Sequence, residues 1–182
     1  MIELPFTEEM KVTAEERAEE MGKLNNSILE GRGTPAGFLS EEAFLNYFPD
    51  SKLVPQTGTQ KYKFDIMFRD LKCELKTIRR TVKPSLGYEC SIAKTSTHQK
   101  PDMYIFLSIE YRDKNKLIPK AVWLLGWISK EDFYKKAKFL TKGTIDLDNN
   151  HVVSQDKYNI QIWRLKDILK KEFQTNDDID WN

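Results

Sequence analysis

The chain has 182 residues, of which 40% are hydrophobic, 12% aromatic and 31% charged, and its formal net charge is +1. This length and apolar content predict one folded domain over residues 1–173 and exclude a disordered or fibrous protein. No apolar run reaches the ~18 residues of a membrane span, and the first residues lack a signal-peptide pattern. Cys73 and Cys90 show no CxxC spacing, so we expect a cytoplasmic protein in a reducing setting, with no membrane partner.

The charges are unevenly distributed along the chain. Residues 1–50 hold four Lys and Arg against eleven Asp and Glu, whereas residues 72–100 hold seven against two. The basic middle of the chain suits a polyanion such as nucleic acid. Solvated loop charges would give the same pattern, so charge alone leaves both interpretations open.

Two helices are expected before the sheet. The capping box Thr13 to Glu16 and the apolar spacing behind it predict a helix that runs to about Leu29. Three glycines and a proline in residues 31–37 end that helix, and Ser40 is the expected N-cap of a second one that ends near Pro49. Residues 52–56 are expected to form an edge strand because Pro55 cannot donate to a central ladder.

The remaining elements alternate between strands and helices. Residues 61–69 and 72–78 predict a β-hairpin, and the aromatic and β-branched segments 103–111 and 121–128 predict central strands. Ser129 to Asp132 is a second capping box, which opens a helix to about Leu140. A last strand over 158–163, a last helix over 165–173 and a mobile acidic tail over 174–182 complete the prediction. The expected class is α/β (α+β), with a mixed central sheet flanked by helices.

The hairpin is the segment that suggests chemistry. Closure at Asp70-Leu71, or by a four-residue loop over residues 69–72, would set Met67 opposite Glu74 and Asp65 opposite Lys76. Alternation along the strands then places Asp65, Glu74 and Lys76 on one face and an apolar set on the other, namely Ile66, Phe68, Cys73 and Leu75. Two neighbouring carboxylates are typical ligands of Mg²⁺ or Mn²⁺. A lysine beside them can orient water or offset the charge that develops on a phosphoryl group. The alternative is an exposed Asp65–Lys76 ion pair, worth ~0–1 kcal/mol.

Phe64-Asp65, eight intervening residues and then Glu74-Leu75-Lys76 resemble the signature of the PD-(D/E)XK nuclease superfamily, which has the restriction-endonuclease-like fold. The resemblance covers residues 38–128 and leaves the first helix and the region past Ser129 as additions. It implies a helix, a β-meander that carries the Asp and the Glu-x-Lys on successive strands, a crossover helix and a further strand. Phe64 stands where the family has proline, and Pro84 with Gly87 restricts the crossover to a short helix or a strand.

The resemblance also implies roles for single residues. Asp65, Glu74 and the backbone carbonyl of Leu75 would hold Mg²⁺ or Mn²⁺, together with an acidic residue of the first core helix, for which Glu41 is the first candidate and Glu42 the second. Lys76 would position water for the hydrolysis of phosphodiester bonds, with DNA favoured as the substrate and internal cleavage as the mode. Both helix acids are equally explained as first-turn residues that the helix dipole favours.

Nucleic-acid contacts are expected from the basic stretch that follows the motif. The candidates are Thr77, Arg79, Arg80, Lys83, Lys94, His98 and Lys100. Each of them is as well explained by an exposed loop, and His98 by a structural role. The alternative function is a non-catalytic module of the same fold that binds nucleic acid or a protein, and the sequence is compatible with a homodimer.

Overall fold

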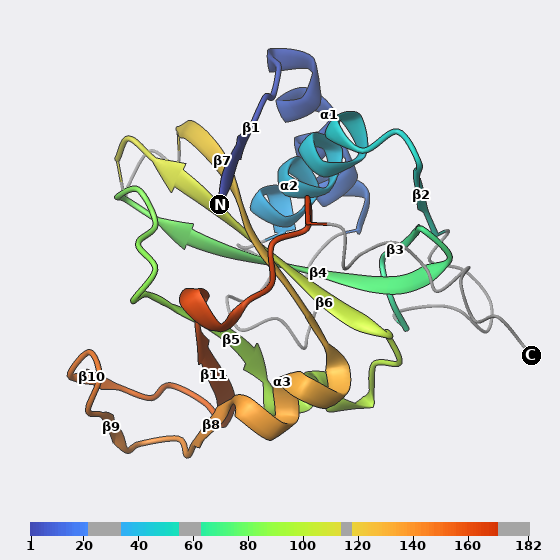
Figure 1. Cartoon of the computed structure of the whole chain (residues 1–182). Helices are drawn as coiled ribbons and strands as arrows, with labels where there is room; N and C mark the ends of the chain where they lie inside the picture. Colours follow the sequence, from blue (N-terminus) through green and yellow to red (C-terminus); the bar gives the residue numbers. More distant parts are fainter. Residues whose placement is uncertain (22–33, 55–62, 114–117, 171–182) are drawn as a thin grey trace, which may run out of the picture.

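The computed structural model describes residues 1–21, 34–54, 63–113 and 118–170. Its centre is a mixed six-stranded sheet with the strand order β1-β7-β6-β4-β3-β2 (Figure 1). β4 and β6 are parallel, and the other neighbours are antiparallel. The strands are β1 Ile2–Leu4, β2 Ser51–Leu53, β3 Ile66–Phe68, β4 Leu71–Arg80, β6 Met103–Tyr111 and β7 Pro119–Ser129. The fold is therefore α+β, which confirms the predicted class and the two central strands.

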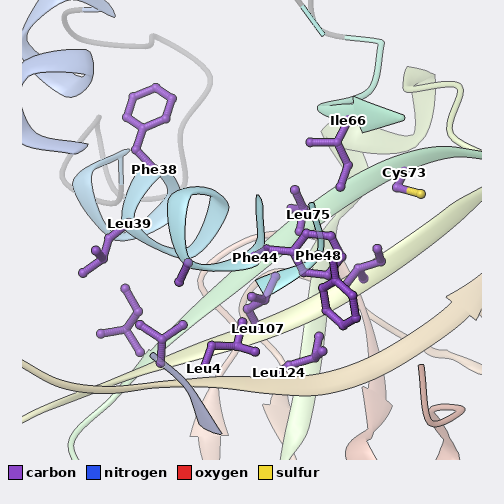
Figure 2. Packing of buried hydrophobic residues seen from close by; sticks show 14 of the residues in the cluster. Leu4, Phe38, Leu39, Phe44, Phe48, Ile66, Cys73, Leu75, Leu107 and Leu124 are labelled. Atoms are coloured by element: carbon purple, nitrogen blue, oxygen red, sulfur yellow. The ribbon is translucent and has the colours of Figure 1, made fainter. Parts of the chain in front are cut away.

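Two helices, α1 (Glu8–Met21) and α2 (Thr34–Tyr47), cover one face of the sheet (Figure 1). Phe38, Leu39 and Phe44 of α2 belong to the same buried cluster as Leu75 of β4 and Leu107 of β6 (Figure 2). A fully buried side chain of this size contributes ~1.5–3 kcal/mol to stability. The predicted apolar face of the hairpin is confirmed by a buried set that consists of Ile66, Phe68, Cys73 and Leu75.

A smaller sheet and a short helix cover the opposite face. This sheet has the order β5-β11-β8, built from Glu89–Ala93, Lys157–Gln161 and Lys138–Leu140, and α3 spans Lys130–Lys136. A second core lies between the layers and includes Phe106, Trp123, Phe133 and Ile160. The remaining elements are the hairpin of β9 (Ile145–Asp146) and β10 (His151–Val152) and the 3₁₀ turns η2 (Lys94–His98) and η3 (Ile162–Arg164). The crossover between β4 and β6 thus consists of strand β5 and turn η2.

The starts of the first two helices differ from the sequence prediction. α1 begins at Glu8, not at Thr13, because the Thr7 hydroxyl accepts a hydrogen bond from the Met10 amide at 3.2 Å and so caps the helix earlier. α2 begins at Thr34, ahead of the expected cap Ser40, since Pro35 is tolerated in a first turn. The predicted end of the first helix near Leu29 lies outside the described residues.

The C-terminal region also departs from the prediction. Ser129 caps α3 as expected, by accepting from the Asp132 amide at 3.2 Å, but the helix ends at Lys136 and β8 follows. Of the strand predicted over 158–163, residues 158–161 belong to β11 and residues 162–163 belong to the 3₁₀ turn η3. Residues 165–170 are not helical, because this segment runs along β7 and forms an isolated bridge to it. Residues 171–182, which include the predicted acidic tail, lie outside the described residues.

The turn of the hairpin is Arg69-Asp70, not Asp70-Leu71. Both residues have positive φ angles, 48° and 62°, as a two-residue primed turn requires. Met67 therefore pairs with Lys72 and not with Glu74. The prediction was wrong by two residues in register, and a slip of two leaves each side chain on its predicted face.

β4 extends well beyond its partner β3. The ladder between them ends at the pair of Ile66 and Cys73, whereas β4 continues beside β6 as far as Arg80. Within the described residues, one edge of β4 is consequently left without a paired strand past Cys73. None of the helices in these residues combines the length and the apolar character that crossing a membrane requires.

Candidate active site

The site begins where β3 ends and β4 continues. The Asp65 amide donates to the Cys73 carbonyl at 3.0 Å, and Asp65 Oδ2 accepts from the Leu75 amide at 2.8 Å. A carboxylate thus takes the place of a paired strand at this edge. Because the amide and carbonyl of one strand residue point to the same edge, the Leu75 carbonyl is directed to the side on which Asp65 lies.

Glu74 and Lys76 form a closed polar group with Gln99. Lys76 Nζ donates to Glu74 Oε1 at 2.6 Å and to Gln99 Oε1 at 3.0 Å, and Gln99 Nε2 donates to Glu74 Oε1 at 2.6 Å. The Glu74 side chain is only 5% exposed, and its second oxygen, Oε2, is buried without a hydrogen-bond partner among the described residues. A buried carboxylate oxygen left without a donor is costly and is normally met by an ion, a ligand or water.

Glu41 approaches this group from α2. Arg17 of α1 binds two carboxylates at once, with Nη2 at 2.8 Å from Glu41 Oε2 and Nη1 at 2.6 Å from Glu42 Oε1. The guanidinium carbon also lies 4.1 Å from the centre of the Phe38 ring. Glu41 is therefore held in one orientation by a residue outside the segment that the motif covers.

Three carboxylates of the site influence one another electrostatically. Burial raises the pKa of Asp65 well above its usual range, and the charges of Glu74 and Glu41 raise it further. Burial likewise raises the pKa of Glu41 to about 7, with Arg17 opposing the rise and Glu74 adding to it. A divalent cation would remove this repulsion. The structure thus brings together the predicted residues Glu41, Asp65, Glu74 and Lys76.

The first four predicted nucleic-acid contacts are spread over two faces. Thr77 and Arg79 alternate with Lys76 along β4 and so lie on its opposite face. Arg80 donates through Nη2 to the Glu89 carbonyl at 2.7 Å and stacks over the Tyr88 ring at 4.9 Å, while Lys83 lies 4.5 Å from the centre of the Trp123 ring.

The other three candidates, Lys94, His98 and Lys100, lie on the segment that contains Gln99. Lys94 forms an exposed ion pair with Asp156 at 3.3 Å. The exposed His98 ring donates through Nδ1 to the Thr95 carbonyl at 2.6 Å. The Lys100 amide donates to the Lys63 carbonyl at 3.0 Å, and its side chain is exposed.

Two residues of the site carry no signal in the sequence. Gln99 lies between the candidates His98 and Lys100, but a glutamine 23 positions after Lys76 fits no spacing rule. Arg17 is one charged residue of an acidic helix, and nothing in the sequence marks it as a partner of α2. Its partners Glu41 and Glu42 are 24 and 25 positions away, beyond residues 22–33, which the structure does not describe. Only the packing of the layers reveals that Gln99 meets Glu74 and Arg17 meets Glu41.

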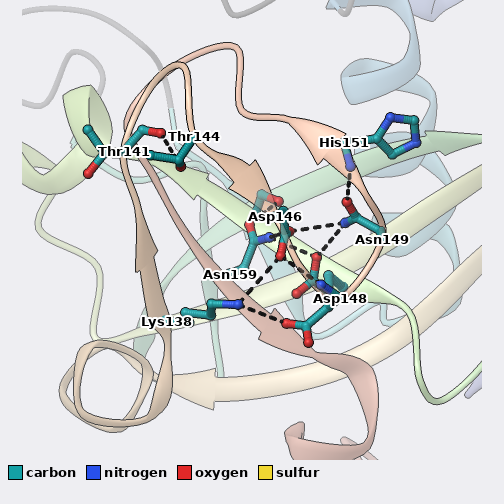
Figure 3. A network of polar contacts seen from close by, with 10 residues as sticks. Lys138, Thr141, Thr144, Asp146, Asp148, Asn149, His151 and Asn159 are labelled. Atoms are coloured by element: carbon teal, nitrogen blue, oxygen red, sulfur yellow. Dashed lines mark hydrogen bonds and ion pairs between the residues drawn. The ribbon is translucent and has the colours of Figure 1, made fainter.

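A second acidic group lies on the outer side of the small sheet. Among the described residues, Glu89, Asp146 and Asp148 form the one group of three acids in which one oxygen of each lies within 4.8 Å of the other two. Figure 3 shows Asp146 and Asp148 of this group. Both Asp146 oxygens already accept hydrogen bonds, Oδ1 from the Asp148 amide and Oδ2 from Asn149 and Asn159. Burial and the Asp146 charge raise the pKa of Glu89. These hydrogen bonds hold the β9–β10 hairpin in place. Both oxygens of Asp146 have partners, whereas Glu74 Oε2 has none among the described residues.

Comparison with known proteins gave no match: no protein-family model fits the sequence, and no curated protein or solved structure resembles it at a significant level.

Proposed function

We propose that the protein is a divalent-metal-dependent nuclease of the PD-(D/E)XK type, with its active site at Asp65, Glu74 and Lys76. The observation that carries the proposal is the buried Glu74 Oε2, which lacks a hydrogen-bond partner among the described residues and lies in a group of mutually repelling carboxylates. Lys76 binds the other oxygen of this carboxylate, Oε1, and a buried oxygen such as Oε2 is normally met by an ion, a ligand or water.

The order of the elements supports the same proposal. α2 is followed by the antiparallel strands β2, β3 and β4, and then by a crossover to β6, which is parallel to β4. This is the order that the resemblance implies, with a strand and a 3₁₀ turn in place of the crossover helix. Asp65 directly precedes β3, and Glu74 and Lys76 lie on β4.

The donor set fits Mg²⁺ or Mn²⁺, which prefer oxygen ligands. Asp65, Glu74 and Glu41 would supply carboxylate oxygens, and Leu75 would supply its carbonyl. Their oxygens are less tightly grouped than those of the Glu89 group. Arg17, the Leu75 amide and Lys76 each hold one of them. The bound cation would polarise the phosphodiester and lower the pKa of a water molecule.

Lys76 has the second chemical role in the proposal. Its ammonium is held by Glu74 and Gln99. The Lys76 side chain as a whole is 20% exposed, so a substrate can reach it. From this position it orients a water molecule or offsets the charge that develops on the phosphate. DNA is the favoured substrate and internal cleavage the favoured mode, and the two free thiols, Cys73 and Cys90, favour a reducing, cytoplasmic setting.

The test is a cleavage assay with matched variants. Wild type, Glu74→Gln and Lys76→Ala are incubated with plasmid, linear duplex, single-stranded DNA and RNA in Mg²⁺, Mn²⁺ or EDTA. We expect cleavage that requires metal and is lost in both variants. Asp146→Asn, which neutralises an equally buried acid of the Glu89 group, is the control and should cleave like wild type.

Thermal stability separates the nuclease from a non-catalytic binding module. Mg²⁺ should raise the Tm of wild type and of Asp146→Asn but not that of Glu74→Gln. If Mg²⁺ stabilises Glu74→Gln and not Asp146→Asn, the metal belongs to the Glu89 group and the proposal fails. If no protein cleaves and wild type retards nucleic acid in a salt-dependent way, the binding module takes its place.

A further inference from the structure

A row of aromatic side chains leads from the candidate active site to the protein surface. Tyr104 is the register partner of Glu74 across β4 and β6, so the two side chains lie side by side on one face. The Tyr104 hydroxyl is 3.2 Å from that of Tyr134, and the Tyr134 and Tyr158 ring centres are 4.9 Å apart. Phe139 continues the row, 4.9 Å from Tyr158. Exposure rises along it, from 0% at Tyr104 to 42% at Phe139.

Four different elements contribute to this row. Tyr104 belongs to β6, Tyr134 to α3, Tyr158 to β11 and Phe139 to β8, where it pairs with Tyr158 across the small sheet. The inner end belongs to the second core, whereas Tyr134 and Tyr158 are only partly buried at its margin. A core alone would not require the row to continue as far as an exposed phenylalanine.

Cations lie at both ends of the row. Lys94 Nζ is 5.5 Å from the centre of the Phe139 ring, and Lys94 begins the turn η2, which leads to Gln99. Gln99 in turn binds Lys76, whose charge acts on the Tyr134 hydroxyl and opposes the rise that burial causes in its pKa. Rings flanked by ammonium groups suit bases joined by phosphates.

We propose that the three outer rings of this row, Tyr134, Tyr158 and Phe139, bind unpaired bases of the substrate strand, so that the preferred substrate is single-stranded nucleic acid or a single-stranded end. Aromatic side chains stack on any base whose face is free, whereas neighbouring base pairs cover the faces inside a duplex. This inference rests on the proposed nuclease function, because the row ends beside Glu74 and Lys76.

The protein contains a matched control for this row. Trp163 in η3 is 55% exposed, and the Arg164 guanidinium lies 4.4 Å from the centre of its ring. It therefore offers the same combination of an exposed ring and a cation. Tyr158 lies near the start of β11, whereas Trp163 follows the end of this strand at Gln161. There the Trp163 amide donates to the Leu86 carbonyl at 3.0 Å.

The test measures binding in EDTA, so that cleavage does not intervene. Fluorescence anisotropy with a labelled 20-nucleotide single strand and a duplex of the same sequence compares wild type, Phe139→Ala, Tyr158→Leu and Trp163→Ala. We expect wild type to prefer the single strand, and Phe139→Ala to weaken that binding about ten-fold. Trp163→Ala should bind like wild type. Phe139→Ala removes an exposed ring and is the decisive variant if Tyr158→Leu fails to fold.

Two outcomes would contradict the proposal that these rings bind bases. One is equal affinity of wild type for duplex and single strand, and the other is single-strand binding that Phe139→Ala leaves unchanged. The failure of the nuclease proposal looks different. If single-strand binding depends on Phe139 but no metal supports cleavage, the row is correct and the catalytic role is wrong. If metal-dependent cleavage occurs with the same rate on both substrates in Phe139→Ala and wild type, the catalytic role is correct and the row is wrong.

Discussion

Glu41 ties the stability of the metal-free protein to pH. Its pKa of about 7 in the folded chain exceeds the usual 4.5, so the folded state holds the proton more tightly than the unfolded state. The resulting stabilisation is complete below pH 4.5 and is lost as the pH rises through 7, with an upper bound of ~3 kcal/mol. Asp65 acts in the same direction. Thermal melts in EDTA between pH 5 and 8 should show Tm falling with pH in wild type and falling less in Glu41→Gln. An equal fall in both would contradict this role of Glu41.

Arg17 should matter more for stability than its position on an appended helix suggests. Arg17→Ala leaves the largely buried carboxylates of Glu41 and Glu42 without their partner, and we expect a loss of about 1–3 kcal/mol. Lys11→Ala on the same helix removes a pair in which Glu8 is 87% exposed, and should cost ~0–1 kcal/mol. Urea unfolding of both variants measures the difference, and equal losses would speak against the proposed hold on Glu41.

The site was predictable as far as local sequence determines it. Asp65, Glu74 and Lys76 belong to one hairpin, so the alternation of side chains along its strands is enough to predict which face of the sheet each one occupies. Gln99 and Arg17 could not be found, because their positions depend on how the crossover segment and α1 pack against the sheet. The register was missed for a simpler reason: a primed turn usually contains glycine or asparagine, and Arg69-Asp70 contains neither.

At the scale of elements, the turn of the hairpin is a point of backbone strain. Asp70 has a φ of 62° and is exposed. Asp70→Val places a β-branched side chain in the left-handed region and should destabilise the protein by about 1–2 kcal/mol. Asp70→Gly should be neutral or stabilising, since glycine adopts this region freely. Thermal denaturation of the pair tests the turn, and equal stability of the two variants would argue against it.

Gly126 allows the C-terminal segment to pack on β7. Its φ is +143°, and an added Cβ would lie 2.7 Å from the Lys166 carbonyl oxygen and 2.9 Å from Leu165 Cβ. Gly126→Ala should therefore cost roughly 2 kcal/mol or more. Gly87→Ala, where nothing lies within 4 Å, should stabilise slightly or have no effect. Denaturant unfolding distinguishes them, and a Gly126→Ala protein as stable as Gly87→Ala would show that this packing does not constrain the residue.

The elements that the sequence predicted best are those with the strongest apolar pattern. β6 has the predicted bounds, and segment 121–128 lies within β7, because both strands are buried on two faces. The prediction of a helix from residue 165 was wrong for residues 165–170, the part that the structure describes, because tertiary contacts override local propensity. The Lys166 amide and carbonyl exchange hydrogen bonds with those of Trp127, at 2.8 and 3.0 Å, which holds this segment extended.

At the scale of the whole molecule, the central sheet separates two cores, and the candidate site lies where both covering layers reach β4. α2 brings Glu41 from one side, and the segment of η2 brings Gln99 from the other. A change in the position of either layer would therefore alter the site without any substitution in Asp65, Glu74 or Lys76.

The pairing of β1 with β7 sets a condition on how the chain folds. Ile2 lies opposite Leu124, 122 positions further along, so β1 is synthesised long before its partner. At ordinary rates of translation the interval is roughly ten seconds, far longer than the time in which local structure forms. Contacts of such long range slow the final assembly, and until β1 joins the sheet the edge of β7 is open to other chains.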